Sequence, residues 1–300
     1  MTQAGCADWA VNDHWIHKLT SIGRPLDGSC PTNRAVLVVT PSMALFGLAW
    51  SLHGGAAWTA ALADALVFAL SAFGSWAISR ELLPDDHAAA FVGVVLAFVA
   101  CLASSPGLLV WFVTLGLVRM VNRTSGLPAR TSDSIALTIL SVWVVYATQS
   151  PWFGGVAAMA FVLDGVLQAP LRKQWLLAFV CLGAMVVYTV DYDVALLHFT
   201  APDSLLEWVT VVVLVLFALN MVRLKKIHSR GDVGQQYLDL ERVKGGMAIV
   251  ILATLQGMGD MSDVLVLLAA MGGVCLGLAF RRAFRNPVPE PLNPDPGETK

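Results

Sequence analysis

Residues 56–87, AAWTAALADALVFALSAFGSWAISRELLPDDH, decide the fold class of this chain. The run 56–79 is apolar except for one acid, Asp64, and it ends abruptly in the charged residues 80–87. A helix of about 20 apolar residues is as long as the hydrocarbon core of a bilayer, about 30 Å. The stretch therefore predicts a membrane-spanning helix that contains a lone acid and is followed by a short charged connection.

The composition of the whole chain agrees with this interpretation. Hydrophobic residues make up 57% of the 300 residues and charged residues only 13%, with a mean hydropathy of +0.69. Soluble domains carry roughly 25% charged residues, so much of this surface is expected to face lipid. The five cysteines are scattered and form no CxxC, so we expect neither a disulfide framework nor a metal site.

Apolar segments recur along the chain from residue 35 to residue 280. Ten of them can be recognised, at about 35–52, 56–79, 88–104, 107–121, 134–149, 152–169, 174–190, 204–222, 245–259 and 261–280. Several are near the lower length limit for a complete span, so their boundaries carry an uncertainty of a few residues.

The connections between these segments fall into two alternating kinds. Connections without any Lys or Arg lie at 53–55, 104–106, 149–151, 191–203 and 257–263. All 19 Lys and Arg residues belong to the other kind, to the helix ends beside it or to the termini; this kind comprises 80–87, 122–133, 170–173, 223–244 and the tail from 281. Short connections rich in Lys and Arg stay on the cytoplasmic side of a membrane. The sequence therefore predicts an all-α, polytopic transmembrane helical bundle of about ten helices with both termini cytoplasmic, and we expect it in the plasma (inner) membrane.

The transmembrane domain covers residues 35–285, and three segments of the chain are expected to lie outside the membrane itself. Residues 1–34 form a cytoplasmic N-terminal segment in which Trp9, Ile16 and Leu19 could share one face of a short helix on the membrane surface. Residues 286–300 contain five prolines and are expected to be a disordered tail.

The third is the long cytoplasmic connection 223–244. Its basic cluster, 223–230, suits anionic lipid headgroups, although ordinary topology determination explains the same charges. Apolar residues then recur at helical spacing and predict an amphipathic helix on the membrane surface over 233–243. Its apolar positions are Val233, Tyr237, Leu240 and Val243.

Asp64 and Asp164 are the acids buried inside apolar segments. A carboxylate in hydrocarbon is costly, so it must face a polar cavity, meet a cation or stay neutral. Our leading hypothesis is a secondary transporter of a small solute, with both acids lining the transport path. The simpler interpretation is a neutral acid hydrogen-bonded to a neighbouring helix, which contributes roughly 0.6 kcal/mol.

A second set of candidates lies in the predicted cytoplasmic turns. If these turns meet at one mouth of the bundle, they place arginines, which bind phosphate in bidentate geometry, beside several carboxylates. This arrangement would suit an integral membrane enzyme that acts on a lipid-linked phosphate or a similar anion, whereas simple surface salt bridges are the structural alternative. The candidate residues are Arg80, Glu81, Asp85, Asp86, His87, Arg119, Arg123, Asp133 and Arg172.

A third hypothesis is a non-catalytic subunit of a membrane complex, docked through its N-terminal segment or its surface helix. The expected partners are the bilayer itself and a protein partner or a second copy of the chain, and no nucleic acid. Gly273 and Gly277 form a GxxxG pair in the last segment, which allows close helix approach inside the bundle or between protomers. We expect the contact inside the bundle.

Overall fold

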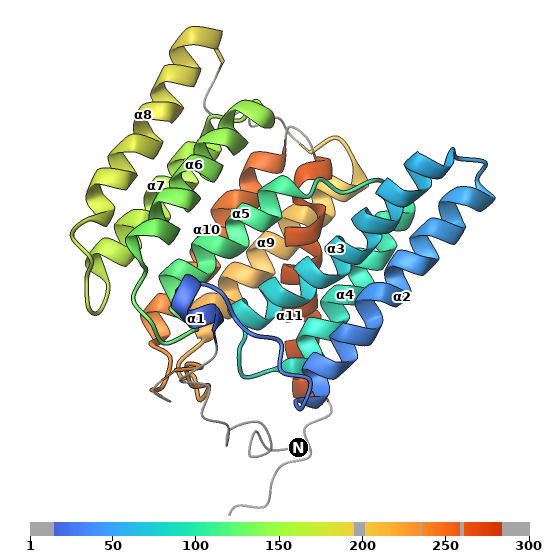
Figure 1. The fold of residues 1–300 in the computed structure, drawn as a ribbon, viewed down its shortest axis with the longest axis horizontal. Helices are drawn as coiled ribbons and strands as arrows, with labels where there is room; N and C mark the ends of the chain where they lie inside the picture. Colours follow the sequence, from blue (N-terminus) through green and yellow to red (C-terminus); the bar gives the residue numbers. More distant parts are fainter. Residues whose placement is uncertain (1–14, 195–201, 234–235, 259–260, 284–300) are drawn as a thin grey trace, which may run out of the picture.

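The computed structural model describes residues 15–194, 202–233, 236–258 and 261–283, and these residues form an all-helical bundle (Figure 1). A four-residue helix, α1 (Ile16–Leu19), precedes ten longer ones. These are α2 (Pro31–His53), α3 (Trp58–Leu82), α4 (His87–Ala103), α5 (Leu109–Asn122), α6 (Thr131–Ala147), α7 (Trp152–Val166), α8 (Gln174–Tyr192), α9 (Leu205–Arg223), α10 (Leu240–Leu255) and α11 (Leu265–Ala283). Two short 3-10 turns, Gln256–Met258 and Met261–Val264, join α10 to α11.

Each of the ten predicted apolar segments corresponds to one of the helices α2 to α11. Five of the described helices, α2, α3, α8, α9 and the stretch Met261–Arg281, are long and apolar enough to cross a membrane, and α4 to α7 are shorter apolar helices. The structure is therefore compatible with an integral membrane protein.

The connection before α10 differs from the prediction. No surface helix covers 233–243, because residues 236–239 are not helical and Leu240 begins α10 itself. The Asp239 carboxylate caps this helix by accepting a hydrogen bond from the backbone N–H of Arg242 at 2.9 Å. Val243 is fully buried. The apolar spacing that predicted a surface helix thus belongs partly to the first turn of a core helix. Of the predicted N-terminal surface helix, the described residues include α1, with Ile16 and Leu19, whereas Trp9 lies outside the described residues, as does the predicted tail 286–300.

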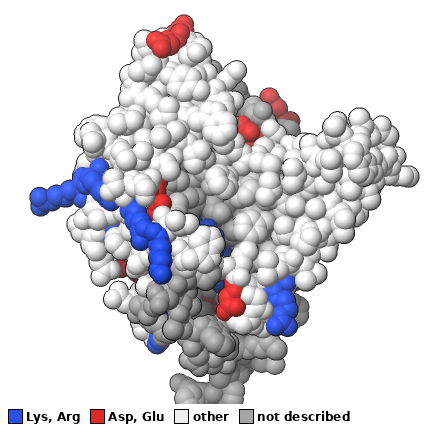
Figure 2. Space-filling model, viewed as in Figure 1, with Lys and Arg blue, Asp and Glu red and all other residues white. Residues whose placement is uncertain are grey.

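The described parts of the two kinds of connection lie at opposite ends of the bundle (Figure 1). At one end, the turns without basic residues meet, where the Gly107 N–H donates to the Ser262 carbonyl at 2.9 Å. At the other end, charged groups link the connections, as in the pair of Asp86 and Arg281 at 3.7 Å. The upper part of the face in Figure 2 shows no Lys or Arg, and the basic side chains lie lower. The described chain enters and leaves the bundle at this end, which we call the charged end.

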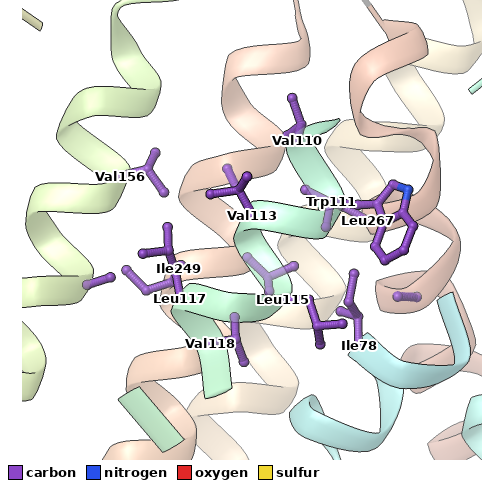
Figure 3. Packing of buried hydrophobic residues seen from close by; sticks show 14 of the residues in the cluster. Ile78, Val110, Trp111, Val113, Leu115, Leu117, Val118, Val156, Ile249 and Leu267 are labelled. Atoms are coloured by element: carbon purple, nitrogen blue, oxygen red, sulfur yellow. The ribbon is translucent and has the colours of Figure 1, made fainter. Parts of the chain in front are cut away.

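Helix α5 forms the centre of the core (Figure 3). Ten of its 14 residues are buried. By contrast, the outer helices α2, α8 and α9 bury only three or four residues each and expose large apolar side chains. A helix surrounded on all sides holds its ends in place. The last turn of α5 supplies Arg119 and Asn122 to the charged end, and Arg123 follows directly as the C-cap residue.

Candidate functional site: a cavity at the charged end

The first charged cluster forms around Glu81, in the last turn of α3. Its side chain is 1% exposed, and its Oε1 accepts hydrogen bonds from Arg119 Nε at 3.0 Å and Arg24 Nη1 at 3.4 Å. Arg24 also makes a bidentate ion pair with Asp232, with both N–O distances at 2.7 Å. Burial tends to lower the pKa of Arg24, but the charges of Asp232 and Glu81 outweigh it and raise the pKa above its usual value. The cluster ties the N-terminal segment and the 224–239 connection to α3 and α5.

A cavity of about 600 Å³ opens beside this cluster. This volume lies in the range of small-molecule sites, about 300–1,000 Å³. Its polar lining includes Arg24, Arg80, Arg119, Arg230, Asp27, Glu81, Asp232, His87 and His228. Its apolar lining includes Leu26, Phe73, Trp76, Ala77, Pro84 and Leu238. Four guanidinium groups face three carboxylates, so the lining is net positive when both histidines are neutral.

Arg80 is a cavity-lining arginine whose guanidinium group has no carboxylate partner among the described residues. Its Nη1 donates to Thr32 Oγ1 at a long 3.4 Å, and its guanidinium carbon lies 5.4 Å from the centre of the Trp76 ring. Among the described residues, no carboxylate lies within ion-pair distance of this side chain. Arg24 and Arg119 both use Glu81 instead.

Several cavity residues also keep a buried polar atom without a hydrogen-bond partner among the described residues. These atoms are Trp76 Nε1, Arg80 Nε, Glu81 Oε2 and His87 Nδ1. An unsatisfied buried polar group costs about 1–3 kcal/mol, and most such groups in proteins do find partners. Four of the fifteen such atoms among the described residues therefore belong to side chains that line this cavity.

The second charged cluster is closed. Asp164, at the end of α7, has no exposed surface. Its Oδ1 accepts from Arg123 Nη2 at 2.7 Å and from Arg242 Nη1 at 2.9 Å, and its Oδ2 accepts from Gln174 Nε2 at 2.8 Å. Arg242 reaches further, donating to the Val121 carbonyl at 2.8 Å. The carboxylate therefore joins the ends of α5, α7, α8 and α10.

The other predicted acids at this end have local partners. Asp85 accepts hydrogen bonds from the backbone of His228 at 2.9 Å and of Ser229 at 2.8 Å, and so holds the connection after α9. Burial tends to raise the pKa of Asp85, but these hydrogen bonds outweigh it and hold the pKa below its usual range. Asp86 caps α4, and Asp133 accepts from the Ser21 N–H at 2.6 Å.

Two predicted residues stand apart from these networks. Arg172 is exposed in the turn before α8. Asp64 lies in the other half of α3, where it is half-buried and accepts a hydrogen bond from Ser51 Oγ of α2 at 2.6 Å. The structure thus gives Asp64 and Asp164 entirely different surroundings.

Sequence reasoning missed several members of the clusters. Arg24 and Asp232 lie in segments without helical periodicity, and no sequence signal connects them to Glu81. The sequence predicts Arg242 in the connection 223–244, within the surface helix 233–243, whereas it belongs to the first turn of α10. Asp239 directly before the apolar run, with Glu241 in the first turn, is a recognisable helix start, and it could have found this helix end.

No protein-family model, curated protein or solved structure matches this chain. Within the described residues, no group of three or more His, Cys, Asp and Glu side chains is arranged to hold a metal ion. The interpretation of the site therefore rests on its own geometry.

Proposed function

We propose that the chain is an integral membrane protein with its charged end on the cytoplasmic side, and that the cavity beside Glu81 binds an anionic group such as a phosphate. The site would serve a membrane enzyme acting on a lipid-linked phosphate or a similar anion. The observation that carries the proposal is Arg80, a cavity-lining guanidinium without a carboxylate partner among the described residues.

The surrounding charges support an anion rather than a cation. Arg24 and Arg119 approach the same oxygen of Glu81, and this carboxylate is therefore already neutralised. An incoming oxyanion would meet the guanidinium group of Arg80, which lines the cavity. Hydrogen bonds between a guanidinium and an oxyanion are about twice as strong as neutral ones.

The first test compares anion binding by two arginine variants of the full chain in lipid nanodiscs. Inorganic phosphate at a hundredfold excess over its Kd should stabilise the wild-type protein by about 2.7 kcal/mol against unfolding, relative to chloride at equal ionic strength. Arg80→Gln should lose this stabilisation, because it removes the unpaired cation. Arg34→Gln, an exposed arginine at the same end that does not line the cavity, should keep it. Equal phosphate stabilisation of the wild type and Arg80→Gln would contradict the proposal.

A secondary transporter remains the second candidate, and one observation favours it. Asp64 is half-buried inside a long apolar helix, and among the described residues its carboxylate has a single hydrogen-bond partner, Ser51. Intramembrane carboxylates with few partners often lie on ion or proton pathways. Asp164, which accepts hydrogen bonds from two arginines and a glutamine, has no surface left for a passing solute.

Asp64→Asn tests the transport hypothesis. If a carboxylate couples solute movement to an ion, the amide should abolish accumulation in proteoliposomes and leave the amount of folded protein unchanged. Counterflow and accumulation assays measure this directly with any solute that the wild type moves. Accumulation at the wild-type rate would remove Asp64 from the pathway.

The exposed basic residues of the 223–230 segment stay a proposed contact for anionic headgroups. Arg223, Lys225 and Lys226 are exposed. Each such residue near an anionic surface contributes about 1 kcal/mol of attraction.

A further inference from the structure

The cavity lining has two chemically distinct parts, which lie along one face of α3. Phe73, Trp76, Ala77 and Arg80 all line the cavity. Their spacing, i, i+3, i+4 and i+7, places them in one stripe of the helix. Three apolar side chains therefore lead to a guanidinium at the charged end.

This stripe has the polarity of an amphiphile. From Phe73 to Arg80 the helix rises about 10 Å at 1.5 Å per residue. If α3 crosses the bilayer, Arg80 lies at the headgroup level and Phe73 lies within the hydrocarbon. Leu26 adds apolar surface to the lining from the N-terminal segment.

We infer that the ligand of this cavity is an amphiphile, a phosphate monoester of an apolar chain, with its phosphate at Arg80 and its chain along Phe73, Trp76 and Ala77. The inference rests on the proposed function, because it takes the anion site at Arg80 as given and names the molecule that carries the anion. A free inorganic anion would make no contact with the apolar side chains along this stripe, whereas an apolar chain attached to the phosphate would.

The apolar chain of the ligand should supply much of the ligand's affinity for the cavity. Burial of one methylene group strengthens binding about fourfold. Three or four methylenes along the stripe would therefore make dodecyl phosphate bind about 100-fold more tightly than inorganic phosphate.

A native thiol can report occupancy of the cavity. Cys30 lines it and is half-exposed, whereas Cys101 and Cys181 are buried. In the full chain carrying Cys6→Ser and Cys275→Ser, the rate at which a small maleimide modifies Cys30 then measures how much of the cavity is free. The probes are dodecyl phosphate, inorganic phosphate and neutral dodecyl maltoside, each added to the protein in phosphatidylcholine nanodiscs.

We expect dodecyl phosphate to protect Cys30 at about 100-fold lower concentration than inorganic phosphate, and dodecyl maltoside not to protect it. Phe73→Ser should raise the concentration of dodecyl phosphate needed by at least about tenfold and leave that of inorganic phosphate unchanged. Leu26→Ser, in the partly exposed N-terminal segment, provides the same comparison without altering a membrane helix. Phe179→Ser on the exposed face of α8 is the matched control and should behave as the wild type.

The outcomes separate the two proposals. If dodecyl phosphate protects Cys30 at the same lower concentration, relative to inorganic phosphate, in both Phe73→Ser and Leu26→Ser as in the wild type, this lower concentration reflects partition into the bilayer. In that case the inference of an amphiphilic ligand is wrong, while the proposed anion site is unaffected. Equal protection by dodecyl maltoside also overturns the amphiphile. Protection by neither phosphate overturns the anion site and the amphiphile together.

Discussion

Two acids with the same sequence context, Asp64 and Asp164, have different surroundings in the folded chain. Each is the only acid in its apolar segment. Asp164 accepts hydrogen bonds from two arginines of neighbouring helix ends, whereas Asp64 has one hydroxyl partner on the adjacent helix. A fully paired buried carboxylate holds helix ends together, and a sparsely paired one is available for other chemistry.

Asp164→Asn should therefore destabilise the protein. The amide would leave the guanidinium groups of Arg123 and Arg242 without a counter-charge, and breaking a buried ion pair from one side costs about 3–5 kcal/mol. Asp64→Asn is the matched control and should cost less than about 1 kcal/mol, because only one hydrogen bond changes. Denaturant unfolding in detergent measures the free energy of unfolding of both variants. Equal losses of stability in the two variants would show that the hydrogen bonds of Asp164 do not hold the helix ends together.

At the scale of elements, the contact of α4 with α11 depends on glycine. A Cβ atom at Gly273 would lie 2.5 Å from the backbone nitrogen of Gly93, and one at Gly277 would lie 2.6 Å from the Ala89 Cβ. Backbone atoms cannot move aside as a flexible side chain can. The GxxxG pair therefore serves close approach inside the bundle, as its sequence favoured.

Gly273→Ala should push the two helices apart and destabilise the protein by about 1–3 kcal/mol, the usual cost of overpacking. Gly183→Ala in α8 provides the contrast, because nothing lies within 4 Å of the added Cβ. Helix propensity should make that variant neutral or more stable by up to about 1 kcal/mol. Thermal unfolding measures the change in stability of both variants. A Gly273→Ala protein as stable as the wild type would mean that the two helices can move apart without a loss of stability.

At the scale of the whole molecule, the separation of the two kinds of connection defines the charged end. Its clusters draw on the N-terminal segment, the ends of α3, α5 and α7 and the starts of α8 and α10. The cavity lies at this end, so the proposed orientation of the bundle also assigns the ligand to the cytoplasmic side.

Cysteine labelling in cells tests that orientation. In a background without native cysteines, Lys226→Cys at the charged end should react with an impermeant maleimide only after the membrane is opened. Gly54→Cys at the opposite end should react in intact cells, and both positions are exposed in the structure. The physical reason is that positively charged connections remain on the cytoplasmic side. Labelling of Lys226→Cys in intact cells would reverse the orientation, and with it the side from which the cavity is filled.

The sequence alone predicted the ten longer helices of the described residues, the alternation of the connections and the segregation of the basic residues. It could do so because a run of apolar residues and the positions of Lys and Arg are local features of a sequence. It also named most of the charged residues that meet at the charged end. Only the tertiary structure decided which charges pair: Arg24 with Glu81 and Asp232, Arg123 and Arg242 with Asp164, and Arg80 with none of the described carboxylates. The reason is that an ion pair depends on how helix ends distant in sequence are packed side by side, and local periodicity carries no information on that distance.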